Sequence, residues 1–164
     1  MLIVLSGLPG TGKTTIAREL ARHLAGVHLR IDSIEQALRN RGWDVSGEGY
    51  AVAYAIAEDN LRLGRIVIAD SVNPWPVTRD GWRSVAERAG VRVIDVEIVC
   101  ADADEHRRRV EIRRADIPGH RVPTWPEVIE RDYRPWTRDR VVIDTARASI
   151  EACVRTVLAE ITSP

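Results

Sequence analysis

The amino-acid sequence predicts an α/β fold, a three-layer αβα sandwich built around a five-stranded parallel sheet. Three observations predict it. Apolar runs of strand length alternate with stretches of helix length along the 164 residues. Glycine or proline stands at most of the junctions between them. A glycine-rich loop joins the first apolar run to the first helical stretch. Because strands and helices alternate, we expect right-handed crossovers that cover both faces of the sheet.

Three of the predicted strands lie in the first half of the chain. They are mainly apolar runs, the pattern of strands buried on both faces, at residues 1–5, 27–31 and 65–70. The helices between them are predicted at residues 13–24, 33–40 and 48–63. Asp32 is predicted to cap the second of these helices, with Glu35 three residues later as its capping-box partner. The glycines in residues 42–49 predict a loop.

The second half of the chain continues the alternation. Two further strands are predicted at residues 91–99 and 140–143. Helices are predicted at residues 78–89, 102–115 and 149–161, and a short helix begins with a capping box at Thr124. Prolines keep residues 73–76 out of a helix, and proline and glycine make residues 116–123 a loop long enough to move.

Composition and charge exclude several classes of protein. Apolar residues make up 45% of the chain and charged residues 29%, which supports a buried core and excludes a disordered or fibrous chain. The 24 basic residues match the 24 acidic ones, so the zero net charge argues against nucleic-acid and membrane partners. No secretory signal or membrane-length apolar run is present. Cys100 and Cys153 lack metal-ligand spacing and indicate reduced thiols. We therefore expect a cytoplasmic single-domain protein, either a monomer or a homodimer.

The most specific motif lies between the first strand and the first helix. Residues 7–14 match G-x-x-x-x-G-K-[ST] in the strand–loop–helix context that this motif requires. The glycines let backbone N–H groups face phosphates, Lys13 reaches the β- and γ-phosphates, and the Thr14 hydroxyl binds Mg²⁺. Lys13 is also the only lysine of the chain. We therefore predict ATP and Mg²⁺ as cofactors, held by Gly7, Leu8, Pro9, Gly10, Thr11, Gly12, Lys13, Thr14 and Thr15.

Carboxylates stand at the ends of two other predicted strands, where parallel sheets bind their ligands. Asp70 follows four apolar residues, as in a Walker B strand, and we expect it to act on Mg²⁺ or to contact the substrate. Asp32 is a candidate base that accepts the proton of an acceptor hydroxyl, a role compatible with capping the next helix. Glu35 is either a capping partner or a substrate contact.

An arginine-rich stretch follows the fourth predicted strand. A helix that closes over the site can bring arginine to the transferring phosphoryl group, and the candidates are Arg107, Arg109 and Arg113. Such a run is also typical of a solvated helix face, with pairs such as Glu105–Arg109. Residues 107–136 are predicted to form a small mobile lid. Further candidates for contact with the substrate are Tyr54, Asn73 and Trp75.

Together these motifs resemble the small P-loop kinases, the zeta-toxin and AAA_33-like group. The likeness spans nearly the whole chain, is nearest to the chloramphenicol phosphotransferases, and is carried by residues 31–37, 66–70, 82–84, 99–102, 142–145 and 149–152. It implies a single P-loop kinase domain over residues 1–164, Asp32 as the base, and Thr145 and Arg147 near the adenine. Polynucleotide kinases carry an arginine one helical turn after the catalytic aspartate, where this chain has Glu35.

We therefore predict an ATP-dependent phosphotransferase that moves the γ-phosphoryl group to a hydroxyl of a small molecule, an antibiotic or a metabolite. Asp32 serves as general base, and Lys13 with a lid arginine stabilises the transferring group. Two alternatives stay open. One is a polynucleotide or RNA-end kinase, for which residues 121–140 supply a local basic patch. The other is a regulatory switch that hydrolyses the nucleotide.

Overall fold

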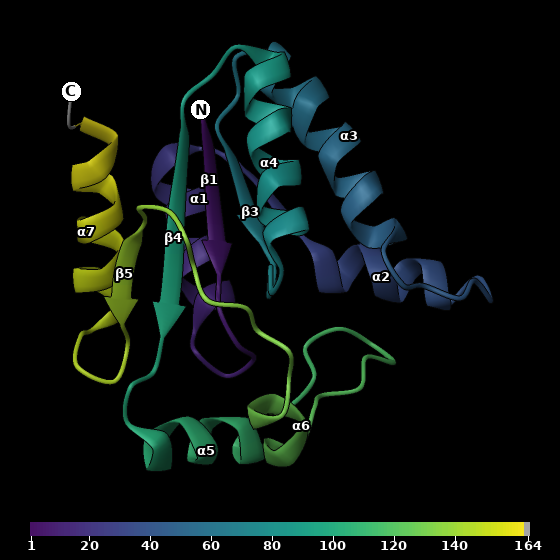
Figure 1. The fold of residues 1–164 in the computed structure, drawn as a ribbon, viewed down its shortest axis with the longest axis vertical. Helices are drawn as coiled ribbons and strands as arrows, with labels where there is room; N and C mark the ends of the chain where they lie inside the picture. The colour runs from purple at the N-terminus through teal and green to yellow at the C-terminus, as the bar shows by residue number, and fades with distance from the viewer. Residues whose placement is uncertain (163–164) are drawn as a thin grey trace.

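The computed structural model describes residues 1–162 and arranges its strands in one parallel sheet (Figure 1). The order across the sheet is β2-β3-β1-β4-β5. The strands are β1 (Leu2–Ser6), β2 (Val27–Arg30), β3 (Val67–Asp70), β4 (Val93–Val99) and β5 (Val141–Asp144). The five-stranded parallel sheet predicted from the sequence is confirmed.

Seven helices lie within the described residues. They are α1 (Lys13–Leu24), α2 (Ile31–Arg39), α3 (Glu48–Arg62), α4 (Pro76–Ala89), α5 (Ala103–Ile112), α6 (Trp125–Ile129) and α7 (Ile150–Thr162). Helices α1 and α7 cover one face of the sheet, and α3 and α4 cover the other. Helices α5 and α6 lie beyond the carboxyl ends of the strands, at the bottom of Figure 1.

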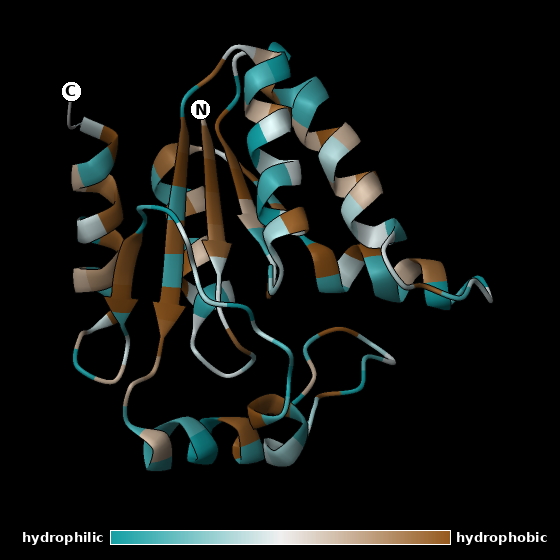
Figure 2. Cartoon of the chain, viewed as in Figure 1, coloured by the Kyte–Doolittle hydropathy of each residue, from teal (hydrophilic) through white to brown (hydrophobic). Residues whose placement is uncertain are grey.

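The pleat of the central strand creates two cores. On β1, Ile3 and Leu5 pack with α1 and α7, whereas Leu2 and Val4 pack with α3 and α4, and all four side chains are fully buried. Figure 2 shows the strands as mainly apolar, with hydrophilic interruptions in β4, and the helices as mixed. The three-layer αβα sandwich is therefore confirmed.

Strand β4 departs from the apolar pattern on one face. Asp95 and Glu97 are both buried there, and they pair with Arg83 at 2.9 Å and Arg140 at 2.7 Å. In Figure 1 the segment that joins α6 to β5 runs across this face of β4 in place of a helix. The buried carboxylates are thus neutralised by arginines of α4 and of that segment.

Two local predictions need correction. Strand β2 runs directly into α2, whose N-cap is Arg30, so Asp32 lies in the first helical turn and does not cap the helix. Pro76 is the first residue of α4 rather than part of the preceding loop, because proline has no N–H to leave unpaired at that position. By contrast, the capping box at Thr124 is present as predicted.

No helix in residues 1–162 is both long enough and apolar enough to cross a membrane. Cys100 and Cys153 are buried and do not form a disulfide.

Candidate active site

The loop between β1 and α1 is shaped to surround an anion. Gly12 precedes α1 with φ of 94°, a left-handed conformation that glycine adopts without strain. Gly10 lies so close to α5 that a Cβ added there would meet Val110 Cγ2 at 2.5 Å. The Thr11 hydroxyl donates a hydrogen bond to the Leu8 carbonyl at 2.9 Å and closes the loop. Gly10, Gly12 and the first residues of α1 border one cavity, where the N-terminus of the helix favours an anion.

Lys13 is a buried cation beside this loop. Its side chain is nearly enclosed, and Nζ donates a hydrogen bond to the Leu8 carbonyl at 2.8 Å. Burial lowers the pKa of Lys13 to about 8, although the negative charges of Asp70 and Asp32 oppose that shift. A bound phosphate group would supply a negative charge beside this buried ammonium and so favour its protonated form.

Two cavities meet at Lys13. The smaller, of about 300 Å³, is lined by the glycine-rich loop, the start of α1 and several arginines. The larger, of about 410 Å³, extends from the loop to α2 and to the segment around α6. Three side chains, those of Lys13, Thr14 and Arg113, border both cavities. A group bound in one cavity is therefore adjacent to a group bound in the other.

Asp32 faces the larger cavity from the first turn of α2. Its carboxylate lies 3.7 Å from Arg30 Nη2 and 4.0 Å from His120 Nε2, and about a third of the side chain stays exposed. These are longer contacts than hydrogen bonds, so the carboxylate oxygens keep the capacity to accept a proton from a bound group.

Asp70, at the end of β3, is buried in the same cavity wall. Its Oδ2 lies 3.2 Å from His28 Nε2, and the Thr14 hydroxyl also donates to it. Burial alone would raise the pKa of Asp70, but the contact with His28 and the charge of Lys13 lower it below its ordinary value. Asp70 is therefore an ionised carboxylate next to the Thr14 hydroxyl.

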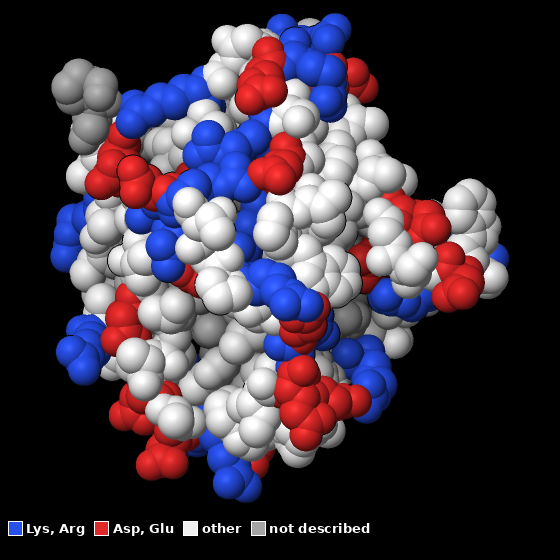
Figure 3. All heavy atoms as spheres, in the orientation of Figure 1, with Lys and Arg blue, Asp and Glu red and all other residues white. Residues whose placement is uncertain are grey.

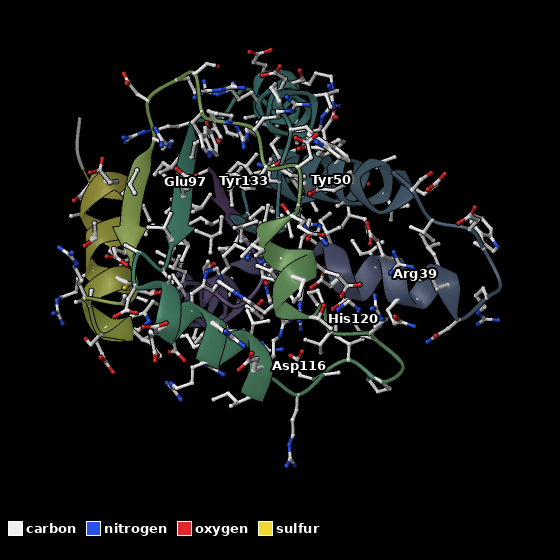
Figure 4. The ribbon with its side chains drawn as sticks, turned by 60° about the horizontal axis from the view of Figure 1, so that its bottom comes forward. Arg39, Tyr50, Glu97, Asp116, His120 and Tyr133 are labelled. Carbon is white, nitrogen blue, oxygen red and sulfur yellow. The ribbon has the colours of Figure 1, made fainter. Side chains whose placement is uncertain are left out.

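The loop that follows α5 is tied to the sheet through Asp116. Its carboxylate accepts hydrogen bonds from Arg30 at 2.8 and 3.0 Å and from Arg18 at 2.6 Å. These bonds hold the pKa of Asp116 well below its ordinary value. Figure 4 shows Asp116 near the end of α5 and His120 further along the same loop, beside α2. The loop thus contributes Asp116 to the lining of the smaller cavity and Gly119, His120 and Arg121 to that of the larger one.

Helix α5 is attached to the glycine-rich loop by a buried histidine. His106 Nε2 lies 2.8 Å from the Pro9 carbonyl, and its ring packs edge-on against Trp125 of α6 at 5.2 Å. On the same helix, Arg109 donates hydrogen bonds to the hydroxyl and the carbonyl of Thr145, at 2.9 and 3.1 Å. Helix α5 therefore joins the loop, α6 and the turn after β5.

Most of the predicted site residues line these cavities. The larger cavity brings together Pro9, Lys13, Thr14, Asp32, Glu35, Asp70 and Arg113. The smaller brings together Gly10, Gly12, Lys13, Thr14, Thr15, Arg109 and Arg113. Gly7, Leu8 and Thr11 shape the loop without lining either cavity, and Thr145 contacts it by donating its hydroxyl to the Thr11 carbonyl at 2.9 Å.

Five further predicted residues also lie outside the walls of these two cavities. Tyr54 packs edge-on against Trp82 at 4.7 Å and donates its hydroxyl to the Thr78 carbonyl, so it belongs to the core between α3 and α4. Asn73 is fully buried and donates to the Ser6 hydroxyl at 2.9 Å.

The other three are surface residues. Trp75 donates its indole N–H to Asp132 at 3.0 Å, Arg107 pairs with Glu111 at 2.8 Å, and the exposed Arg147 lies 3.4 Å from Asp144.

Sequence reasoning missed several residues of the site. They are His28, Arg30, His106, Asp116, His120 and Arg131. The one local signal was the charge of Arg30 at the end of a strand, where ligands of parallel sheets bind. The others stand in segments without a motif, and their partners are distant in sequence.

Comparison with known proteins finds a family model that matches more than half of the chain. The AAA_33 family model, described as an AAA domain, matches residues 2–131. A cytidylate kinase from Afipia carboxidovorans is 26% identical over 97% of this chain and 96% of its own length.

Two solved structures share the fold. One is the Mycobacterium tuberculosis APS kinase CysC in complex with AMPPNP and APS, which has a TM-score of 0.73 and 20% identity over 99% of this chain and 97% of its own. The other is a gluconokinase from Sinorhizobium meliloti, with a TM-score of 0.61 and 19% identity over 96% of this chain and 89% of its own.

Proposed function

Because the chain belongs to the AAA_33 family of P-loop proteins, we propose that it is an ATP-dependent kinase that transfers the γ-phosphoryl group to a hydroxyl of a small molecule. The smaller cavity is then the donor cavity, which takes the nucleotide, and the larger is the acceptor cavity. Residues 107–136 act as the lid over both. The names of the cytidylate kinase, APS kinase and gluconokinase relatives support phosphoryl transfer as the reaction class.

One observation carries the proposal: the two cavities share a wall formed by Lys13, Thr14 and Arg113. Two cations and a hydroxyl stand where a γ-phosphate in the donor cavity would meet a nucleophile in the acceptor cavity. Phosphoryl transfer depends mainly on such positioning and on charge stabilisation, and requires little covalent chemistry from the protein.

In the proposed reaction Asp32 accepts the proton of the acceptor hydroxyl. The hydroxyl oxygen forms a bond to the γ-phosphorus as the bond to the β–γ bridging oxygen breaks, and ADP leaves with that electron pair. Lys13 and Arg113 stabilise the charge on the transferring group. After transfer, the proton on Asp32 passes to solvent.

The residues present also fit a Mg²⁺ ion. The Thr14 hydroxyl and the ionised Asp70 carboxylate are adjacent oxygen donors, the class of ligand that Mg²⁺ prefers. In residues 1–162 no cluster of three or more His, Cys, Asp or Glu side chains forms a metal site alone. This agrees with an ion that takes its remaining ligands from nucleotide phosphates and water, and that neutralises phosphate charge when bound.

A second candidate acceptor is a phosphate rather than a hydroxyl. The acceptor cavity is lined by Arg39, Arg113, Arg121 and Arg131, and arginine is well suited to bind phosphate. A nucleoside monophosphate acceptor would make the chain a nucleotide kinase, like the relative named cytidylate kinase.

The experiment is an ADP-release assay with ATP and Mg²⁺ across neutral alcohols, hydroxy acids, nucleoside monophosphates and 5′-hydroxyl oligonucleotides. Acceptor-dependent ADP release supports a kinase, and ³¹P NMR of the product distinguishes a phosphate ester from a diphosphate. ATP hydrolysis that ignores every acceptor favours the regulatory switch. Preference for oligonucleotides favours the RNA-end kinase, although basic and acidic side chains are interspersed on the face shown in Figure 3.

A further inference from the structure

The charges around the acceptor cavity are not balanced within the protein. Two of its arginines already hold carboxylates, because Arg39 pairs with Glu35 at 2.9 Å and Arg121 pairs with Glu127 at 2.6 Å. Glu127 also accepts hydrogen bonds from the backbone N–H and the hydroxyl of Thr124. These acids are therefore occupied and cannot neutralise further cations.

Arg113 and Arg131 are the cavity arginines that remain. Within residues 1–162 neither guanidinium forms an ion pair or a hydrogen bond with another side chain. Both lie close enough to Lys13 for their positive charges to lower its pKa, in addition to the larger effect of burial. Asp32 and Asp70, the other acids of the lining, oppose that shift, so the cavity as a whole holds five cations against four carboxylates.

The two arginines have different positions. Arg113 borders both cavities, so its guanidinium is placed for the transferring phosphoryl group. Arg131 borders only the acceptor cavity and lies just after α6, in the lid. A nucleotide in the donor cavity would thus leave Arg131 without an anion.

We infer that the acceptor carries an anionic group, a phosphate, sulfate or carboxylate, and that Arg131 binds it. This inference rests on the proposed function and specifies its substrate class. A planar guanidinium donates two parallel hydrogen bonds to such a group. Because Arg131 lies in the lid, the lid then closes the cavity only over an acceptor that carries a negative charge. A cavity of about 410 Å³ has the size of a small-metabolite site.

The same arrangement selects against neutral acceptors. A neutral alcohol of similar size would leave Arg131 unpaired under the closed lid, which costs free energy when the guanidinium loses water. The negative charge of the acceptor therefore determines which molecules bind, and the acceptor hydroxyl near Asp32 is the group that is phosphorylated.

The test uses inorganic sulfate as the probe and calorimetry as the measurement. The full chain is first saturated with AMPPNP and Mg²⁺, which fills the donor cavity, and sulfate is then titrated at constant ionic strength. We expect the wild-type complex to bind sulfate and Arg131→Gln to bind it at least about tenfold more weakly, the effect of losing a charge-assisted bidentate contact. Arg131→Lys keeps the positive charge but not the planar guanidinium, so its affinity for sulfate should lie between those of the wild type and Arg131→Gln.

Arg62→Gln is the matched control. It removes the same charge from α3, where Arg62 pairs with Glu58 away from both cavities, and should leave sulfate affinity unchanged. Separate titrations with inorganic phosphate and acetate rank the anion classes. Absence of sulfate binding to the AMPPNP complex, or equal affinity in wild type and Arg131→Gln, would overturn the inference. Absence of AMPPNP binding in the first step would instead overturn the proposed function.

Discussion

At the scale of single residues, Lys13 and Asp32 have different roles in the proposed reaction. Lys13 is a cation enclosed by protein, and Asp32 is an anion with open access to the acceptor cavity. The ammonium is thin enough to lie against the Leu8 carbonyl inside the loop, where the planar fork of arginine would not fit. This accounts for a lysine at this one position of a chain whose other basic residues are arginines.

The proposed role of Asp32 predicts a rate effect without a binding effect. Asp32→Asn keeps the shape of the side chain but removes its ability to take a proton. We expect the turnover rate to fall by about 10² to 10⁴, the usual contribution of a general base. Nucleotide affinity, measured by calorimetry, should stay near the wild-type value. A variant that loses ATP binding but keeps its turnover per bound ATP would show that Asp32 is structural.

The lowered pKa of Lys13 predicts that nucleotide affinity depends on pH. With a pKa of about 8 in the free protein, Lys13 is mostly protonated at pH 7 and mostly neutral at pH 9. Bound phosphates favour the protonated form of Lys13, so at pH 9 the lysine must take up a proton when the nucleotide binds. We expect the affinity for MgADP to fall as the pH rises above about 8, by up to about tenfold per pH unit. Equal Kd values at pH 7 and pH 9 would contradict the assignment.

At the scale of elements, one buried arginine fixes the segment between α6 and β5. Arg79 of α4 is 1% exposed and donates hydrogen bonds to the carbonyls of Asn73, Pro74, Arg134 and Pro135. Its guanidinium also stacks over Trp136 at 4.2 Å. Because this segment leads from the lid back to the sheet, Arg79 sets the position from which the lid extends.

Removing Arg79 should therefore destabilise the fold. Arg79→Met leaves several buried carbonyls without a donor, and we expect a loss of about 3 kcal/mol in the free energy of unfolding. The corresponding fall in Tm is about 6 to 12 °C for a chain of this size. Arg88→Met is the matched control on the same helix, because Arg88 forms an exposed pair with Glu58 that is worth less than about 1 kcal/mol. Similar melting curves for the two variants would mean that Arg79 does not anchor the segment.

At the scale of the whole molecule, the donor cavity is assembled from distant parts of the chain. Its walls come from the glycine-rich loop, from Arg30 at the end of β2, from α5 and from the loop that holds Asp116. A nucleotide bound there contacts both the sandwich and the lid. Binding should consequently stabilise the folded chain as one unit.

Thermal unfolding with and without nucleotide tests this expectation. At a MgATP concentration of about 100 times Kd, the stabilisation is about 2.7 kcal/mol, which raises Tm by about 5 to 11 °C. Lys13→Ala should melt near the wild-type temperature without nucleotide and show no such rise with it. A full rise in that variant would place the nucleotide elsewhere.

The sequence by itself determined the alternation of strands and helices, the glycine-rich loop, and the strand end that carries Asp70. Each of these features depends on residues that are close together in the sequence, either a periodic pattern of apolar side chains or a short motif. Local physical chemistry is therefore enough to predict them. The capping box at Thr124 belongs to the same class.

Only the tertiary structure decided which distant side chains meet. His106 reaches Pro9 across 97 positions of sequence, and Asp116 reaches Arg30 across 86. Likewise, it showed that Arg113 borders both cavities whereas Arg107 faces a partner on its own helix. Such pairings arise because the packing of the sheet and the lid brings these segments together, and a contact set by packing leaves no periodic pattern or spacing in the sequence.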